Sequence, residues 1–224
     1  MQYDFAKGEV LLVDKPLHWT SFDVVAKLRT LCKVKKIGHA GTLDPLATGL
    51  LIICTGQKTK TIEQYQNLPK TYQATITLGA TTPTYDAEFP PENHRPYEHI
   101  TESQVRAIIE KEFMGDILQV PPIYSAIKVK GKSAYQLARK GNKVELEPRK
   151  VHIYRFDLID MRLPHLNVEI ECSKGTYIRS IAHDLGQKLG TGAYLSQLRR
   201  IKIGSFHVEQ AKTIQEWVGI LTKS

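Results

Sequence analysis

Residues 38–49 read Gly-His-Ala-Gly-Thr-Leu-Asp-Pro-Leu-Ala-Thr-Gly, and they place one carboxylate, Asp44, within a glycine-rich segment. Glycine adopts backbone conformations that strain other residues, so a cluster of it indicates tight turns or close approach of the backbone to a partner. Pro45 disfavours helical geometry at the residue before it, so we expect Asp44 to lie on a loop. Asp-Pro beside glycine is also an ordinary turn signal, so residue types alone leave open both a plain turn and a working carboxylate.

An alternating segment at residues 72–78 predicts a strand that carries Tyr72 on its apolar face. One interpretation of Tyr72 is therefore core packing. The other is an aromatic plate that receives a base taken out of a nucleic-acid stack, because enzymes that act on bases must extract them.

Arg179 ends the segment Cys-Ser-Lys-Gly-Thr-Tyr-Ile-Arg at residues 172–179. If Thr176 caps the helix that follows, Arg179 lies in the first turn, where a cation opposes the helix dipole. An ion pair with Asp44 or a contact with phosphate would offset that cost. The alternative is that Arg179 is a surface residue on a helix that tolerates this charge. His39 is a lone histidine, and its pattern favours a structural residue.

The segment 39–58 closely resembles the signature of the TruB family, the tRNA pseudouridine synthases that modify the T loop, and the resemblance extends from residue 9 through residues 211–221. It implies that Asp44 is catalytic, that Tyr72 receives the flipped base and that Arg179 lies beside the aspartate. It also implies a set of residues that bind RNA or shape the site: Lys15, His39, Gly41, Thr42, Leu43, Asp86, Lys128, Lys130 and Leu198.

The activity that the resemblance implies is isomerisation of uridine 55 in the T loop to pseudouridine, by base flipping and by Asp44-dependent cleavage and re-joining of the glycosidic bond. An aspartate is ionised at neutral pH and can form a covalent intermediate, so we expect no cofactor and no metal. The expected partner is tRNA through its T arm, without an obligate protein partner. Two alternatives stay open: an RNA-binding or tRNA-folding factor whose chemistry is dispensable, and a synthase that acts on another RNA.

Strands and helices are mixed without a βαβ rhythm, which predicts an α+β fold with helices on a largely antiparallel sheet. The resemblance implies the pseudouridine synthase fold with a central mixed sheet. Residue patterns predict strands at residues 9–13, 50–54, 72–78, 123–129, 151–158, 166–172 and 201–208.

Capping signals predict where the helices begin. Thr20 with Asp23 opens a helix whose apolar face carries Phe22, Val25, Leu28 and Cys32. Further helices begin near Thr101, Ser133, Thr176 and Thr213.

The chain of 224 residues is expected to form a single catalytic domain over residues 1–224, with a basic RNA-binding insertion around residues 121–150 and no C-terminal PUA domain. The net charge of +8 favours an anionic partner, and eight basic residues against two acidic ones fall between residues 128 and 150. No leader or membrane-spanning segment is visible, so we expect a cytoplasmic protein, and no heptad pattern indicates anything but a monomer. The spacing of Cys32, Cys54 and Cys172 predicts three buried free thiols.

Overall fold

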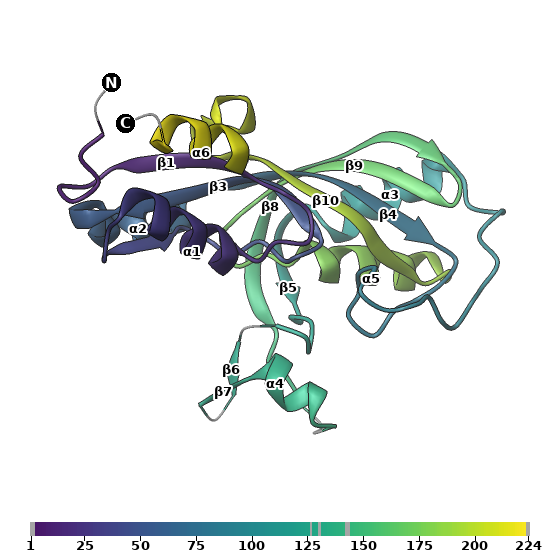
Figure 1. Cartoon of the computed structure of the whole chain (residues 1–224). Coiled ribbons are helices and arrows are strands. Elements are labelled where there is room, and N and C mark those ends of the chain that lie inside the picture. Colours follow the sequence, from purple (N-terminus) through teal and green to yellow (C-terminus); the bar gives the residue numbers. More distant parts are fainter. Residues whose placement is uncertain (1–2, 126, 130, 142–143, 223–224) are drawn as a thin grey trace. The chain divides into compact units, whose positions relative to one another are not determined.

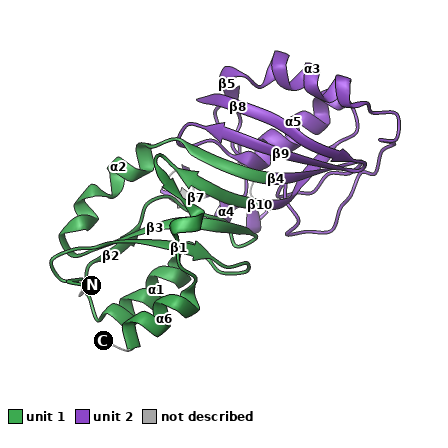
Figure 2. Ribbon diagram, turned by 90° about the horizontal axis from the view of Figure 1, so that it is seen from above, with its two compact units in different colours: residues 1–73, 198–224 green, residues 74–197 purple. Residues whose placement is uncertain are grey.

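Helices and strands follow one another without a repeating order in the computed structural model, which describes residues 3–125, 127–129, 131–141 and 144–222 (Figure 1). The chain divides into two units (Figure 2). Unit 1 comprises residues 1–73 and 198–224, and unit 2 comprises residues 74–197. Two strands contribute residues to both units, namely β4 (Lys70–Leu78) and β10 (Ala193–Ile203). The expected α+β class is confirmed.

Unit 1 is built around strand β3 (Ala47–Thr55). It runs antiparallel to β1 (Val10–Lys15) and β2 (Ile37–His39) and parallel to β10, which also pairs with β11 (Phe206–His207). The helical elements of the unit are α1 (Ser21–Cys32), η1 (Gly56–Thr61), α2 (Ile62–Asn67), η2 (Val208–Gln210) and α6 (Ile214–Thr222).

Strand β3 is buried on both faces, which explains its unbroken apolar sequence. Leu51 and Ile53 join a cluster with the buried faces of α1 and α6, whereas Leu50 and Ile52 join a second cluster with Ile203. Since successive side chains of a strand point to opposite faces, one strand supplies two cores. This rigid strand directly follows the glycine-rich segment and fixes where that segment ends.

Helix α1 begins as predicted, because Thr20 and Asp23 form a reciprocal capping box. Its buried face consists of Ser21, Val24, Val25, Leu28 and Cys32. The prediction that Phe22 belongs to this face is wrong, since Phe22 is 72% exposed. Phe22 is the second residue of the helix and lies one position off the buried stripe that Ser21, Val25 and Leu28 define.

Unit 2 orders its strands β10-β4-β9-β8-β5. Strand β8 (Arg149–Arg162) pairs antiparallel with both β5 (Gly115–Gln119) and β9 (His165–Cys172). Helices α3 (Glu102–Glu112) and α5 (Ile178–Leu189) contact each other. The short β6 (Lys128–Val129), β7 (Lys132–Ser133) and α4 (Ala134–Arg139) extend away from β5 and β8 within this unit (Figure 1).

Three predicted elements differ from the structure. Of the strand predicted at residues 123–129, the described residues form a strand only at Lys128–Val129, and it pairs in a separate two-stranded hairpin. The strand predicted at residues 201–208 is instead the end of a longer strand, β10, followed by a turn and β11. Thr176 does not cap α5, because its hydroxyl donates to Ser173 and the N-cap position is Tyr177.

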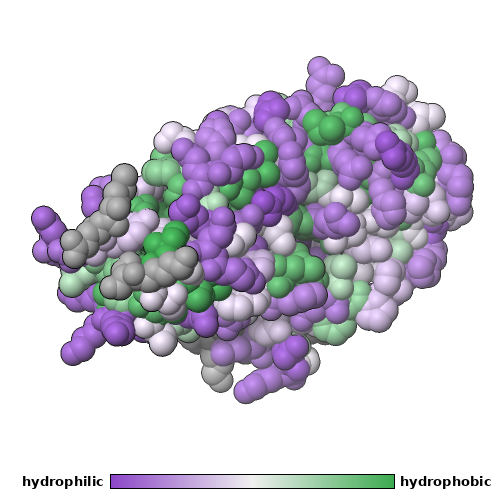
Figure 3. Space-filling model, turned by 45° about the horizontal axis from the view of Figure 1, so that its top comes forward, coloured by the Kyte–Doolittle hydropathy of each residue, from purple (hydrophilic) through white to green (hydrophobic). Residues whose placement is uncertain are grey.

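The three cysteines are free and buried, as predicted. On the face seen in Figure 3, hydrophobic residues form small separate patches among hydrophilic ones. Within the described part of the chain, no helix is both long and apolar enough to cross a membrane.

Candidate active site

The loop that carries Asp44 joins β2 to β3 in unit 1. Backbone hydrogen bonds hold both of its ends: the Ala40 N–H donates to the Ile52 carbonyl at 2.8 Å, and the Ala47 N–H donates to the Asp44 carbonyl at 3.0 Å. In addition, the Pro45 carbonyl accepts from the His18 N–H at 2.8 Å. Asp44 itself is half-buried. The loop prediction is confirmed, and three backbone hydrogen bonds hold the loop around Asp44.

Ser21, the first residue of α1, holds the residue that precedes Asp44. Its hydroxyl accepts from the Leu43 N–H at 2.9 Å and donates to the Leu43 carbonyl at 3.3 Å. Leu43 is 3% exposed and Ser21 is 1% exposed. The start of α1 therefore positions the Asp44 loop, since unpaired buried backbone groups would be costly.

Arg200 on β10 provides a second clamp and was missed by the sequence analysis. Its guanidinium donates to the carbonyls of Leu50 at 2.8 Å, Gly41 at 3.2 Å and Thr42 at 3.4 Å. It is 1% exposed, so these carbonyls replace water around a buried charge. The sequence did hold a signal for a buried arginine. Adjacent side chains of a strand point to opposite faces, so Arg199 and Arg200 could not both point to the same face. The other one, Arg199, pairs with Asp14.

Two glycines of the segment have positive φ, at +101° for Gly41 and +102° for Gly49. Gly49 lies opposite Arg200 in the β3–β10 register, and an added Cβ atom there would come within 2.3 Å of the Arg200 carbonyl oxygen. Only glycine fits this close approach. The close backbone approach at Gly49 is therefore to β10 of the same chain, and approach of the glycine-rich segment to a partner stays a prediction.

Lys15 ends β1 and is fully buried. Its ammonium donates to the carbonyls of Pro16 at 2.9 Å and Trp19 at 2.6 Å. Burial lowers the pKa of Lys15 to about 8, while the Asp44 carboxylate acts in the opposite direction and raises it. Lys15 and Asp44 are therefore brought together, and with Arg200 the loop has two buried cations around it.

His39 ends β2 and is half-buried. Burial and then the charge of Arg200 lower the pKa of its imidazole, which is therefore neutral at pH 7. The exposed ring of Phe22 meets the His39 ring edge-on, with 5.4 Å between the ring centroids. An exposed aromatic side chain next to the loop is a second feature that the sequence analysis did not assign to the site.

Tyr72 and Leu198 are the remaining predicted site residues of unit 1. Tyr72 is 9% exposed on β4, in agreement with its place on the apolar face. Its role as a plate for a flipped base stays a prediction. Leu198 pairs with Ala47, the first residue of β3, in the parallel β3–β10 ladder.

The predicted residues of unit 2 include a buried pair, Arg179 and Asp86, with 3.6 Å between Nε and Oδ2. Arg179 lies in the first turn of α5, as predicted, and also donates to the carbonyls of Thr84 and Tyr124, both at 3.1 Å. Two carbonyl acceptors and the charge of the Asp86 carboxylate therefore offset the opposition between this cation and the helix dipole. No residue pattern predicted this pair, and the expected pairing of Arg179 with Asp44, which belongs to the other unit, stays a prediction.

The backbone at the start of α5 is held by Gln119 at the end of β5. Its amide oxygen accepts from the Tyr177 N–H at 2.8 Å, and its amide nitrogen donates to the Tyr177 carbonyl at 3.1 Å. This side chain takes the place that the sequence analysis gave to Thr176.

In the basic segment, Lys128 is exposed on β6. Lys130, which was predicted with it, lies outside the described residues. Across the residues that the structure describes, no group of three or more histidine, cysteine, aspartate or glutamate side chains could hold a metal ion.

Comparison with known proteins covers almost the whole chain. The model described as "TruB family pseudouridylate synthase (N terminal domain)" matches residues 29–178, and that described as "tRNA pseudouridylate synthase B C-terminal domain" matches residues 179–221. The tRNA pseudouridine synthase B of Phocaeicola vulgatus is 49% identical over 224 residues, which cover 96% of this chain and 95% of that protein. The protein of the same name from Opitutus terrae is 50% identical over 206 residues, covering 92% and 85%.

Among solved structures, the crystal structure of a Cbf5-Nop10-Gar1 complex contains a similar chain, with a TM-score of 0.75 and 27% identity. The match covers 96% of this chain and 54% of that one. The similarity therefore extends through both units of the present chain and about half of the larger relative.

Proposed function

The chain belongs to the TruB family of pseudouridine synthases, and from this we propose that it converts uridine 55 in the T loop of tRNA to pseudouridine, with Asp44 as the catalytic carboxylate. The enzyme class is that of the family: the protein is an RNA pseudouridine synthase with the pseudouridine synthase fold, and its relatives act on tRNA. The choice of uridine and the roles of individual residues are the proposal.

The observation that supports Asp44 most directly is how its loop is held. Ser21 fixes Leu43, Arg200 fixes the carbonyls of Gly41 and Thr42, and Lys15 lies close enough for its pKa to respond to the Asp44 charge. Buried cations that are already satisfied by carbonyls favour a negative charge nearby. A loop held in this way keeps a carboxylate in one place without reorganisation during the reaction.

The chemistry is an isomerisation in which no atom of the uracil is gained or lost overall. The bond between ribose C1′ and N1 breaks, a bond between C1′ and C5 forms, C5 releases its proton and N1 takes one up. In the proposal Asp44 serves the bond-breaking step as nucleophile or as the counter-charge of the sugar. Tyr72 receives the flipped uracil, and Arg179 acts beside Asp44.

In this proposal the remaining predicted residues either bind the RNA or shape the active site. His39, which is neutral at pH 7, and Lys128 contact the RNA, and we add Phe22 because its exposed ring lies against His39. Lys15 and Leu198 support the Asp44 loop, and Asp86 orients Arg179 through the buried pair. Aromatic rings combined with basic groups suit the unstacked bases of an RNA loop.

The test compares wild type with Asp44→Asn on an unmodified T-arm hairpin that carries tritium at C5 of the target uridine. Release of tritium to water reports the loss of the C5 proton, and sequencing locates the pseudouridine. Wild type is expected to release one tritium per RNA, and Asp44→Asn none above background. Glu63→Gln, which removes an exposed carboxylate of the same unit, is the matched control and keeps full activity.

Three results would contradict the proposal. Tritium release by Asp44→Asn would remove the role of that carboxylate. Binding of a correctly folded T arm and of whole tRNA by wild type, without conversion of either, would instead favour a binding or folding factor; conversion at another uridine would favour another RNA site.

A further inference from the structure

Six exposed lysines gather in unit 1 and are not explained by the candidate active site: Lys7, Lys33, Lys35, Lys36, Lys58 and Lys60. They come from three segments, which are the N-terminal turn, the turn between α1 and β2, and η1. Backbone hydrogen bonds join these segments, from the Gly56 N–H to the Lys36 carbonyl at 2.9 Å and from the Gln57 N–H to the Lys7 carbonyl at 3.1 Å. We call these six residues the lysine surface.

No ion pair formed by the described residues includes a member of the lysine surface, whereas Lys111 and Lys188 on unit 2 both pair with Glu112. The nearby carboxylates of Asp4 and Glu9 accept from backbone N–H groups. Like charges held close together repel one another, and an anionic partner relieves this repulsion.

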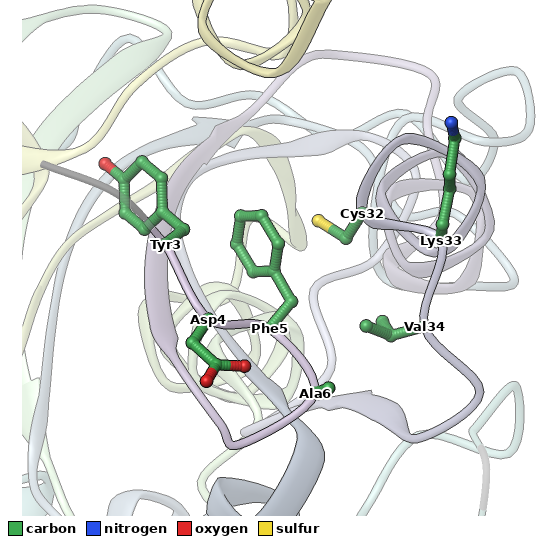
Figure 4. Close-up of a pocket in the computed structure, with 7 residues that line it drawn as sticks. All are labelled: Tyr3, Asp4, Phe5, Ala6, Cys32, Lys33 and Val34. Atoms are coloured by element: carbon green, nitrogen blue, oxygen red, sulfur yellow. The ribbon is translucent and has the colours of Figure 1, made fainter. Parts of the chain in front are cut away.

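Aromatic side chains border the lysine surface. A hollow of about 480 Å³ is lined by Lys33 and by Tyr3, Asp4, Phe5, Ala6, Cys32 and Val34 (Figure 4). The rings of Tyr3 and Phe5 stack with 5.2 Å between their centroids. These two rings also pack on the core of unit 1, so the exposed lysines are what a partner would meet here. Clustered exposed ammonium groups suit phosphates, and the RNA substrate of the proposed function is the partner that supplies them.

The β1–β3 ladder gives the distance from the Asp44 loop. Lys15 pairs with Gly49 near the end where that loop runs into β3, and Val10 pairs with Cys54 at the other end. Five residue steps of about 3.3 Å each separate the two ends by about 17 Å. Lys7 precedes β1 and Lys58 follows β3, so both lie beyond the far end. An RNA that places its target uridine at Asp44 would need to extend well past that nucleotide to reach the lysine surface.

We propose that the lysine surface is a second phosphate-binding site, which contacts the RNA backbone outside the loop that carries the target uridine. The inference takes from the proposed function only that RNA is the substrate. Each lysine that neutralises a phosphate releases counterions, so the contact must appear in the salt dependence of binding, with a slope of about 0.7–0.9 per phosphate in log K against log salt.

The test uses two double variants, Lys35→Gln/Lys36→Gln and Lys58→Gln/Lys60→Gln. Lys111→Gln/Lys188→Gln is the control with the same change in charge. Binding to a full-length unmodified tRNA transcript and to a T-arm hairpin is measured over a range of salt concentrations. Each surface variant is expected to lower the salt slope for tRNA by about 1.4–1.8 and to weaken its binding about 25-fold or more near 0.1 M salt. Hairpin binding and the rate of conversion at saturating hairpin are expected to stay unchanged.

An unchanged tRNA affinity and slope in both surface variants would overturn the proposal, and would be the result if the surface served an acidic protein. An equal loss for the hairpin would also overturn it, because the lysines would then act at the target loop. All six side chains are exposed, so unchanged urea unfolding checks that folding is intact. If wild type binds tRNA through these lysines but converts no uridine, the phosphate-binding site is supported and the proposed function is contradicted.

Discussion

At the residue scale, the neighbourhood of Asp44 is defined by two buried cations that are held by backbone carbonyls. Lys15 donates to Pro16 and Trp19, and Arg200 donates to Leu50, Gly41 and Thr42. Neither depends on the carboxylate for its hydrogen bonds. Removing the charge of Asp44 is therefore expected to change the electrostatics of the site more than its structure.

The titration of Lys15 tests this coupling. Burial lowers the pKa of Lys15 to about 8, and Asp44 opposes this shift because its negative charge favours the ammonium form. In Asp44→Asn that opposition is lost, so the pKa of Lys15 is expected to fall below 8. NMR titration of the lysine Cε resonances measures it. Glu63→Gln should leave the value where it is, and an unchanged pKa in Asp44→Asn would mean that the two groups are not coupled.

Phe22 offers a test of RNA contact that is nearly free of folding effects. The ring is 72% exposed, so Phe22→Ala removes little buried area and should shift the unfolding free energy by less than about 0.5 kcal/mol. If a base stacks on the ring, T-arm affinity is expected to fall about tenfold. Ile159→Ala, which truncates another exposed apolar residue, is the control. Equal affinity of Phe22→Ala and wild type would remove Phe22 from the RNA contacts.

At the element scale, the starts of helices position the candidate site. Helix α1 begins with a capping box at Thr20 and immediately presents Ser21 to the Asp44 loop. Helix α5 begins where Gln119 holds both backbone groups of Tyr177, and Arg179 follows two residues later. In both cases the residue that matters lies in the first turn, where the helix direction is fixed by its cap.

Helix α5 also carries an acid whose burial makes stability depend on pH. Burial raises the pKa of Asp184 from 3.8 to about 6, and the charge of Lys188 acts in the opposite direction. The folded state therefore binds this proton more tightly than the unfolded state. That contribution to stability is fully present below about pH 4 and is lost as the pH rises through about 6.

Asp184→Asn removes this dependence. Relative to wild type, the variant is expected to gain about 1–2 kcal/mol of unfolding free energy at pH 8 and to show no gain at pH 4, a range that allows for partial solvation of the carboxyl. Urea unfolding of both proteins between these pH values measures the difference. A gain of the same size at every pH would show that it does not arise from titration.

At the scale of the whole molecule, each unit has apolar residues of its own to bury. In unit 1 two clusters lie on the two faces of β3. In unit 2, alternate residues of β9, including Leu166, Val168 and Ile170, are buried. This division explains why the candidate site residues fall into two groups, one around Asp44 and one around Arg179.

The three thiols report on this burial. Cys54 and Cys172 are at most 1% exposed, whereas Cys32 is 9% exposed and lines the hollow in Figure 4. Burial raises the pKa of the Cys32 and Cys54 thiols to about 11, so very little thiolate exists at pH 8. With a thiol-specific chromogenic disulfide, the native protein is expected to react slowly and at Cys32 alone. After unfolding, all three thiols are expected to react. Fast reaction of native Cys32→Ser would contradict this.

The sequence by itself determined the local features, because their causes are local. Capping boxes at Thr20 and Thr101, the alternating strand at residues 166–172 and the turn chemistry around Asp44 depend on neighbours a few residues away, and the structure confirms each one. The segment 39–58 also indicated the family, because its order of residues is specific to that family's signature. The prediction of a strand at residues 123–129 was wrong in extent: the described strand there, β6, pairs with β7, a partner that no local pattern specifies.

Only the tertiary structure decided which distant side chains meet. Arg200 lies more than 150 residues from the carbonyls of Gly41 and Thr42 that it holds, and Gln119 is 58 residues from Tyr177. The partner of Arg179 within its unit, Asp86, is likewise remote in sequence. Periodicity reports which face of an element is buried, but it carries no information on which buried polar group will be opposite. That choice follows from strand order and register, through the requirement that every buried charge and backbone group finds a partner.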